Sequence, residues 1–407
     1  MTLRLDRDAV EAVVAATGEP GWLAERRIEA FDLFEKLDMP DPKKEEWRYT
    51  DVRGFDFEVY APPGVAKRSL DLPKPLADKG VVFTDLVNAD PDLVREHFFT
   101  EVPVDEHRFT ALHGAFHSDD VVVYVPRGVD VDVPLEVLRD VDKGGSTFPH
   151  TTIVVEDQAS LTFVDRFKSD DSLMPSLCSS VVEVTAGRGA TVNYISLQEW
   201  GRGVSHFQTQ RFTGYRDSTV RSLAVNLGSK FARTQVESDL KGEGSFSEML
   251  GLYFADADQH FAQRTLQQHV APHATSDLLY KGALKERSRS EYSGLIKVGK
   301  GAQGTDAYQA NRNLVLSEDA LAHSIPQLEI EANEVRCTHG ATVSPVEEEH
   351  LFYLMSRGID RVTAQKLVVF GFFGEVLDRI RLPQVRDDLS DAIAAKVEGT
   401  QRLEVSV

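Results

Sequence analysis

Residues 151–164, TTIVVEDQASLTFV, join a run of β-branched residues to a short polar turn and a second apolar run. Such runs bounded by turn residues are typical of β-strands, and similar runs lie at residues 181–184 and 328–330. The turns recur at intervals of 26 to 31 residues, when one marker residue is taken from each. A near-constant period in this range predicts a solenoid. The markers are Ala159, Gly189, Ser218, Gly244, Ala274, Gln303 and Glu334.

Each repeat contains two short strands around a turn and no helical pattern between them, which predicts a β-helix-like core over residues 79–345. The glycines at positions 187, 189, 242 and 244 are predicted to occupy its corners. A β-sandwich with regular hairpins gives a similar periodicity, so the pattern alone leaves both folds open.

The two ends of the chain are predicted to be helical, over residues 1–78 and 346–407. Apolar residues at three- and four-residue spacing predict N-terminal helices over residues 6–17 and 21–37. Near the C-terminus the same spacing predicts helices over residues 347–356, 360–380 and 387–397, with Pro383 ending the second. Residues 367–373 are apolar on most sides, which fits a helix packed on the solenoid that also presents a surface to a partner.

Composition narrows the class of protein. The 407 residues are 42% hydrophobic and 27% charged, which is typical of a soluble globular chain with a large core. Two cysteines exclude a disulfide scaffold and favour a reducing cytoplasm. A net charge of −20 argues against nucleic-acid binding. Neither a secretory signal nor an apolar run long enough to span a membrane occurs, so we expect a cytoplasmic protein.

Cys337 and His339 form the most suggestive chemical pair, in the stretch EVRCTHGAT at residues 334–342. In a strand, residues i and i+2 point to the same face, so thiol and imidazole would lie side by side. Such a pair is a candidate for metal ligation or reactivity. It is incomplete as a metal site, because a structural zinc site needs about four ligands. The alternative is a buried small residue beside a hydrogen-bonded histidine.

The remaining cysteine and histidines add little to this site. Cys178 is the only other cysteine, and no CxxC pair occurs. His113 and His117, and likewise His269 and His273, have the i, i+4 spacing of a helical metal pair. Neither pair contains the glutamate of an HExxH helix, so we interpret these four as partly buried histidines.

Catalytic and nucleotide-binding motifs are mostly missing from the sequence. Neither a GxxxxGK[ST] phosphate loop nor a GxSxG nucleophile elbow occurs. The GxGxxG match at residues 299–304 is not followed by a helical pattern, so we interpret its glycines as a tight solenoid corner. We therefore expect this chain to bind no nucleotide and to catalyse no reaction.

Longer motifs resemble a known family. Residues 309–317, 326–330, 337–342 and 351–359, together with EWRYTD at residues 46–51, are similar to the SufB/SufD family of iron-sulfur cluster assembly scaffolds. The resemblance covers most of the chain after residue 20. It implies a right-handed parallel β-helix between helical ends, no enzymatic activity, and a complex with the SufB paralogue and the ABC-type ATPase SufC. A homodimer in isolation is also compatible with it.

The EWRYTD and CTHGAT motifs resemble the SufD branch of the family more than the SufB branch. This implies that His339 faces SufB and contributes, with the accompanying Cys337, to a transient iron-sulfur cluster shared by the two chains. Mixed thiolate and imidazole ligation suits a cluster that is built and then handed on. The resemblance also implies that the C-terminal helices bind the ATPase. Candidate partner-binding side chains are Leu351, Phe352, Phe370, Phe372 and Phe373.

Three other interpretations stay open. The chain could be a SufB-like scaffold paralogue, or a purely structural adaptor that uses only its C-terminal helices. It could also be a β-solenoid enzyme acting on polysaccharide. Glu347, Glu348 and Glu349 argue against such an enzyme, because adjacent carboxylates on one helix cannot flank a glycosidic bond from two sides.

Overall fold

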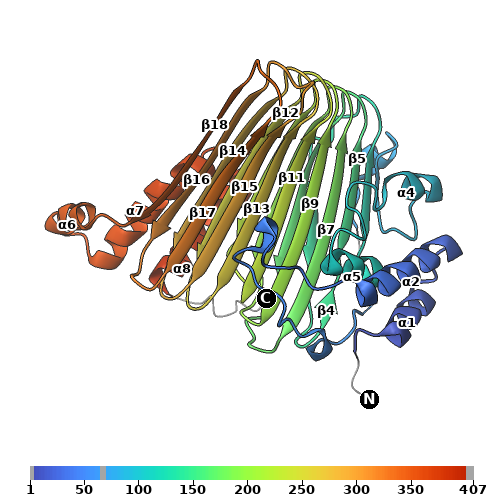
Figure 1. Cartoon of the computed structure of the whole chain (residues 1–407), viewed down its shortest axis with the longest axis horizontal. Helices are drawn as coiled ribbons and strands as arrows, with labels where there is room; N and C mark the ends of the chain where they lie inside the picture. The colour runs from blue at the N-terminus through green and yellow to red at the C-terminus, as the bar shows by residue number, and fades with distance from the viewer. Residues whose placement is uncertain (1–3, 65–69, 400–407) are drawn as a thin grey trace.

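Two parallel β-sheets form a solenoid in the computed structural model, which describes residues 4–64 and 70–399 (Figure 1). From residue 150 onward the strands alternate between the sheets along the chain, so each pair of strands makes one coil. Sheet A contains β1 (Val82–Thr84), β2 (Val121–Val125), β4 (Ser146–Thr147), β5 (His150–Val155), β7 (Ser176–Ala186), β9 (Val204–Gly214), β11 (Phe231–Leu240), β13 (His260–His269), β15 (Arg289–Val298) and β17 (Leu321–Ile330). Sheet B contains β3 (Leu135–Arg139), β6 (Ser160–Lys168), β8 (Thr191–Glu199), β10 (Thr219–Asn226), β12 (Phe246–Ala255), β14 (Thr275–Leu284), β16 (Asp306–Val315) and β18 (Arg336–Pro345).

The predicted turns stack into one column along the solenoid. The Gln158 amide donates to the Arg188 carbonyl at 2.8 Å, and the Gly189 amide donates to the Arg216 carbonyl at 2.9 Å. The same pattern continues to the last coil, where the Gly304 amide donates to the Glu334 carbonyl at 2.6 Å. These ladders confirm the predicted parallel solenoid and exclude the β-sandwich, whose neighbouring hairpin strands are antiparallel.

The four predicted corner glycines are needed for two different reasons. Gly189 and Gly244 have φ values of 67° and 70°, a left-handed conformation that side chains disfavour. At Gly187 and Gly242 the space is too small instead. A Cβ at Gly187 would lie 2.8 Å from the Asp157 nitrogen, and one at Gly242 would lie 1.9 Å from the Arg216 nitrogen.

Two helices correct the prediction of a continuous solenoid from about residue 80. Helices α4 (Pro91–His97) and α5 (Arg108–Phe116) separate β1 from β2, and the parallel coils begin only at β2. Asp90 caps α4 by accepting hydrogen bonds from the amides of its first turn. Helix α5 buries Phe109 and Phe116 in an aromatic cluster with the N-terminal helices. The Asp90-Pro91 pair was the sequence signal for α4, because Pro favours the first helical position.

Most of the N-terminal region lies on the outer face of sheet A, whereas Leu76 packs into the interior cluster at the start of the solenoid. The region contains α1 (Arg7–Thr17), α2 (Gly21–Lys36), η1 (Glu45–Trp47), η2 (Phe57–Val59) and α3 (Lys74–Ala77), which confirms the two predicted helices. The α2 guanidinium of Arg27 is buried, forms an ion pair with Glu19 at 2.8 Å and donates to the His117 carbonyl at 2.7 Å. This contact ties the N-terminal helices to the end of α5.

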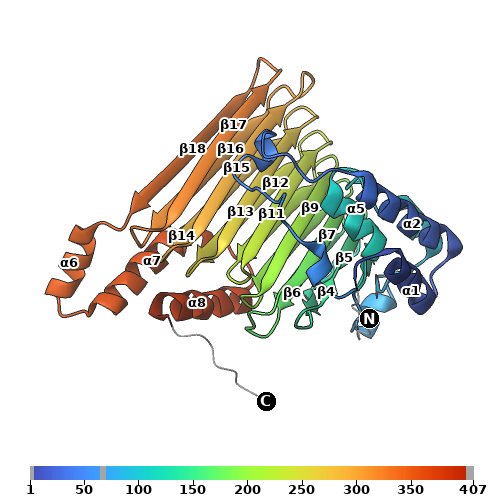
Figure 2. The same cartoon turned by 60° about the horizontal axis from the view of Figure 1, so that its bottom comes forward.

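The C-terminal helices differ in position: the first extends away from the solenoid, and the next two cover the outer face of sheet B (Figure 2). They are α6 (Glu348–Ser356), α7 (Arg361–Leu377) and α8 (Pro383–Glu398), so Pro383 starts α8 as well as following α7. Lys396 holds α8 to the solenoid by donating to the carbonyls of Leu227 at 2.6 Å and Phe254 at 2.7 Å. Residues 400–407 of the predicted C-terminal region lie outside the described residues. Within the part that the structure describes, no helix is long and apolar enough to cross a membrane.

Candidate functional site

The terminal coil, formed by β17 and β18, is open on one side. Sheet A ends at β17 and sheet B ends at β18, so neither strand has a partner on its outer edge among the described residues (Figure 1). Such an edge presents a row of backbone donors and acceptors that can pair with another chain. The solenoid therefore ends in a surface that has the chemistry of its interior.

The side chains on this open end confirm that it is an uncovered interior. Leu328 and Ile330 of β17 are in register with Ile296 and Val298 of β15, which are both fully buried. Without a further coil above them, Leu328, Ile330 and Val343 are 37%, 41% and 47% exposed. We call the inward-facing side chains of this last coil, which include Leu328, Ile330 and Val343, the apolar rung. Such a surface is costly to leave in water and is typical of one that another protein covers.

Cys337 and His339 lie on this rung, on the inward face of β18. Their register partners on β16, Ala307 and Gln309, are buried. The Cys337 side chain is half-buried and packs against a small apolar cluster that contains Ala307. The predicted same-face arrangement is thus confirmed.

The two side chains differ in availability. His339 is exposed, and its ring forms no hydrogen bond with any described residue, so both ring nitrogens are open to a ligand. Burial and the nearby Asp306 carboxylate raise the pKa of the Cys337 thiol. The thiol therefore stays protonated in this chain at neutral pH and would become a ligand only when a metal ion displaces its proton.

No complete metal site accompanies this pair. Over residues 4–64 and 70–399, no group of three or more His, Cys, Asp or Glu side chains is arranged to hold a metal ion. Cys178 is fully buried on β7, where burial and then the Asp165 carboxylate raise the pKa of its thiol well above its ordinary value. It lies near the opposite end of the solenoid from Cys337.

The i, i+4 histidine pairs are structural. His113 and His117 are fully buried around the end of α5, where His113 hydrogen-bonds the Ser179 carbonyl at 2.7 Å and His117 contacts Asp120 at 2.6 Å. His269 is buried inside the solenoid, whereas His273 lies in a corner with a φ of 56°. His113, His117 and His269 are fully buried, so the predicted partial burial underestimated how far these three side chains are shielded from solvent. The GxGxxG match is a corner as predicted, because β16 rather than a helix follows Gly304.

Comparison with known proteins gives the family. A family model for the SufBD core domain of SUF system FeS cluster assembly matches residues 138–372, more than half of the chain. A second model, for the SufBD N-terminal region, matches residues 68–137. The chain belongs to the SufB/SufD family of iron-sulfur cluster assembly proteins.

Individual relatives carry both names of this family. The chain is 28% identical to the iron-sulfur cluster assembly protein SufD of Bacillus subtilis, covering 97% of this chain and 99% of that protein. It is 27% identical to SufB of the same organism, covering 90% and 88%. A SufBD family protein of Staphylococcus saprophyticus is 31% identical over 74% of this chain and 66% of its own length. The two branches of the SufB/SufD family are thus almost equally similar to it.

The five predicted partner-binding side chains of this SufB/SufD-family chain differ in how far they are buried: two are buried, two are half-buried and one is exposed. Leu351 and Phe373 are fully buried, and Phe373 packs in the cluster between α7 and sheet B. These two cannot contact a partner while the helices stay docked, which corrects their predicted role. Phe370 and Phe372 are half-buried, and Phe352 projects from α6 into solvent. Helix spacing could not separate these cases, because residues 367–373 are apolar all round.

Exposed apolar side chains on α6 and α7 that the sequence did not single out extend the surface around Phe352. They are Tyr353, Met355, Val362 and Leu367. An open depression of about 670 Å³ on α6 is lined by Phe352, Tyr353 and the carboxylates of Glu348 and Glu349. The exposed apolar side chains of the C-terminal region therefore gather on α6 and the start of α7.

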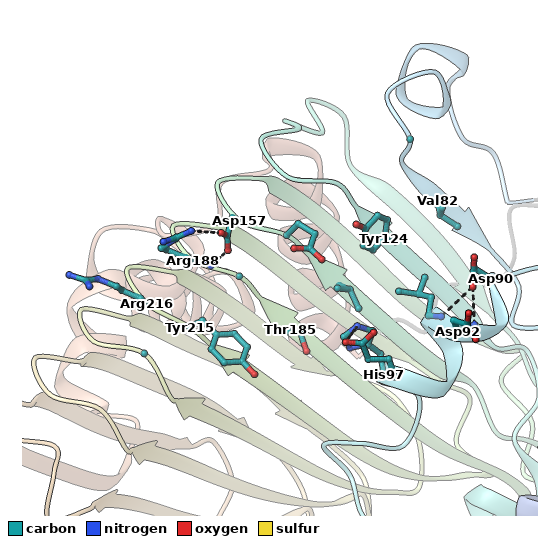
Figure 3. A pocket seen from close by; sticks show the side chains of 17 residues that line it. Val82, Asp90, Asp92, His97, Tyr124, Asp157, Thr185, Arg188, Tyr215 and Arg216 are labelled. Atoms are coloured by element: carbon teal, nitrogen blue, oxygen red, sulfur yellow. Dashed lines mark hydrogen bonds and ion pairs between the residues drawn. The ribbon is translucent and has the colours of Figure 1, made fainter.

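A wide cleft of about 950 Å³ lies elsewhere in the molecule, between α4 and the first strands of sheet A (Figure 3). Tyr124, Thr185 and Tyr215 line its floor. The rim arginine Arg188 forms an ion pair with Asp157 at 2.7 Å, as the dashed line shows. The cleft lies at the N-terminal end of the solenoid, so it does not belong to the surface that carries Cys337 and His339.

Proposed function

We propose that this chain is a SufD-like scaffold subunit that contributes Cys337 and His339 to a nascent iron-sulfur cluster, built at its interface with a SufB-type chain. One observation carries the proposal: the pair lies on the exposed apolar rung at the open end of the solenoid. A partner that covers this rung would bring its own side chains against the imidazole of His339. The cluster is cargo in this proposal, held briefly and then passed on.

The chemistry of the pair supports a shared site. A thiol and an imidazole supply two donors, and an iron-sulfur cluster needs more, so the partner completes the ligand set. An imidazole in place of a thiolate changes the charge and reduction potential at the iron it binds. Incomplete ligation by this chain also makes transfer of the finished cluster easier than from a site with four cysteines.

The SufB-type role is the second candidate, because the chain is 27% identical to a SufB over 90% of its length. The two candidates differ in the partner that each requires. A SufD-like chain should form a heterodimer with the SufB-type chain of the same organism, whereas a SufB-like chain should prefer the SufD-type chain. Co-expression with each paralogue in turn, followed by purification on a tag carried by this chain, separates them.

The cluster proposal is tested by substituting His339 in the assembled complex. His339→Ala should leave the complex intact and reduce iron and acid-labile sulfide per complex after anaerobic reconstitution. Thr338→Ala is the matched control, because Thr338 is its exposed neighbour on the opposite face of β18. Unchanged iron and sulfide for His339→Ala would overturn the proposed ligand role. Cys337→Ser should have a similar or milder effect on both quantities.

We also infer that the α6 surface around Phe352 docks a SufC-type ABC ATPase. This chain has no phosphate loop, and the family works within the SUF system. An ATP-driven step in this proposal therefore takes place on a bound partner, and this chain transmits it without binding nucleotide or catalysing a reaction itself. Exposed aromatic side chains such as Phe352 and Tyr353 are enriched in protein-docking surfaces, where they act as anchors.

A further inference from the structure

The EWRYTD motif forms a strap across the outer face of sheet A, at residues 46–50. Figures 1 and 2 both show this N-terminal segment in front of the middle strands of the sheet, far along the solenoid from α1 and α2. The Glu46 carboxylate forms an ion pair with Arg264 of β13 at 3.0 Å. The Trp47 ring is buried beneath the guanidinium of Arg233, which lies 3.7 Å from the ring centroid. These contacts fix the start of the strap on β11 and β13.

The strap then reaches the terminal coil. The Thr50 hydroxyl donates to the Glu291 carboxylate of β15 at 2.7 Å, and this carboxylate also contacts His260 at 3.0 Å. The Tyr49 ring stacks on His323 of β17, with ring centroids 5.0 Å apart and an angle of 18° between the planes. A segment that belongs to the N-terminal region therefore contacts the last strand of sheet A.

This stacked pair lies beside the open edge of sheet A. His323 is on the outward face of β17, since its register partner is Glu291. A strand added to that edge would lie about 4.8 Å from β17, and side chains opposite or diagonal to His323 would be within reach of its ring and of Tyr49. Tyr49 is 40% exposed, and Leu321, two residues before His323, is 44% exposed. Leu321 and His323 share the outward face of β17, so they flank the open edge on the side opposite to the inward-facing rung.

We propose that Tyr49 and His323 form part of the docking surface for a second SufB/SufD-family chain. The proposal rests on the end-face docking proposed above and extends it from the solenoid to the N-terminal strap. This occupant fits because it would itself offer a solenoid edge, whose backbone can pair with β17 while its side chains contact the aromatic stack. The strap would then make the interface depend on the N-terminal region, which a bare solenoid end would not.

The test compares the association of full-length variants with the SufB-type chain of the same organism, by analytical ultracentrifugation. Tyr49→Ala and His323→Ala should each raise the dissociation constant by about tenfold, as expected for an aromatic residue near a buried contact. Tyr215→Ala is the matched control, because Tyr215 is 43% exposed but lies in the cleft near α4. Melting curves must show that each variant is folded, and His323→Ala tests the surface even if Tyr49→Ala loosens the strap.

Val343→Asp distinguishes the proposed role of the strap from the proposed docking of the solenoid end face. Val343 lies on the apolar rung and outside the strap, so a charge there should disrupt end-face docking. If Val343→Asp weakens association and neither aromatic variant does, the strap inference is overturned and end-face docking stands. If none of the three weakens association, end-face docking fails and the strap inference fails with it.

Discussion

Gly282 of β14 lies directly beneath the ring of Tyr253 of β12, its register partner inside the solenoid. A Cβ atom at Gly282 would lie 2.0 Å from Tyr253 Cε2, which no packed structure tolerates. The missing side chain lets the tyrosine cross over β14, so its hydroxyl donates to the Asn313 side chain of β16 at 2.6 Å. At this point the interior of the solenoid is a packed core and not a channel.

The first prediction concerns this packing. Gly282→Val should lower the free energy of unfolding by about 3 kcal/mol or more, because the added side chain must displace a buried tyrosine and break its hydrogen bond. Gly340→Ala is the control, since nothing lies within 4 Å of a Cβ at that position on the edge strand β18. Denaturant unfolding of both variants checks the prediction, and equal effects would contradict it.

The regular part of this fold could be predicted from the sequence, because it repeats. Each corner needs a residue that tolerates a tight turn, so markers such as Gly189 and Gly244 recur at a constant period, and the structure stacks them as expected. Helices α4 and α5 occur once and bury their aromatic residues against distant segments. Their apolar patterns therefore look like those of the neighbouring strands.

The candidate site could be predicted only in part, for a related physical reason. The spacing of Cys337 and His339 places both on one face of a strand, but their exposure depends on β18 being the last strand of its sheet. The burial of Phe373 and the exposure of Phe352 depend on how α7 docks on sheet B, which a run of apolar residues does not reveal. The contact of Tyr49 with His323 joins positions too far apart in the chain for any local pattern to report.

The second prediction concerns a buried ion cluster near the start of the solenoid. The Arg139 guanidinium is fully buried, donates to Asp165 at 2.9 Å and to Thr151 at 2.8 Å, and also pairs with Asp119 at 3.2 Å. Arg139→Met should cost about 3 to 5 kcal/mol, because it leaves buried carboxylates without their cation. Arg336→Met breaks an ion pair with Asp306 that is exposed to solvent, and its unfolding midpoint should match that of the wild type. Similar midpoints for the two variants would disprove the assigned role of burial.

The third prediction concerns acid sensitivity. Burial lowers the pKa of His206 to about 3, while the unfolded chain has the ordinary histidine value of 6.5. As the pH falls from 6.5 towards 3, the unfolded state binds a proton that the folded state does not. Stability present above pH 6.5 is therefore lost, by up to about 1.4 kcal/mol per pH unit for this histidine.

His206→Gln should accordingly lose less stability than the wild type between pH 7.5 and pH 5.5, and the difference in the linkage slope should approach about one proton at pH 5.5. Glutamine can keep a hydrogen bond to Ser180, which His206 contacts at 3.0 Å. Urea unfolding at several pH values measures the slope. A wild-type slope for His206→Gln would refute the prediction.

Deleting the C-terminal helices is a poor test of ATPase docking, although residues 346–407 form the predicted docking region. Val369, Phe373 and Val376 of α7 are buried against Leu252 and Phe254 of sheet B. Their removal would expose an apolar sheet face, and the truncated chain would aggregate for reasons unrelated to the ATPase. Single substitutions on the outer surface of α6 avoid this problem.

The fourth prediction is therefore that Phe352→Asp weakens binding of a SufC-type ATPase by about tenfold or more, since a charge replaces an exposed aromatic anchor. The melting temperature should not change, because Phe352 is 74% exposed and supports no core contact of the solenoid. Leu173→Asp is the matched control: Leu173 is 83% exposed, but it lies in the loop between β6 and β7. Binding is measured by titrating the purified ATPase onto each immobilised variant. Full-strength binding by Phe352→Asp would show that the ATPase does not dock on α6. Loss of binding by Leu173→Asp would show that the assay responds to any new surface charge.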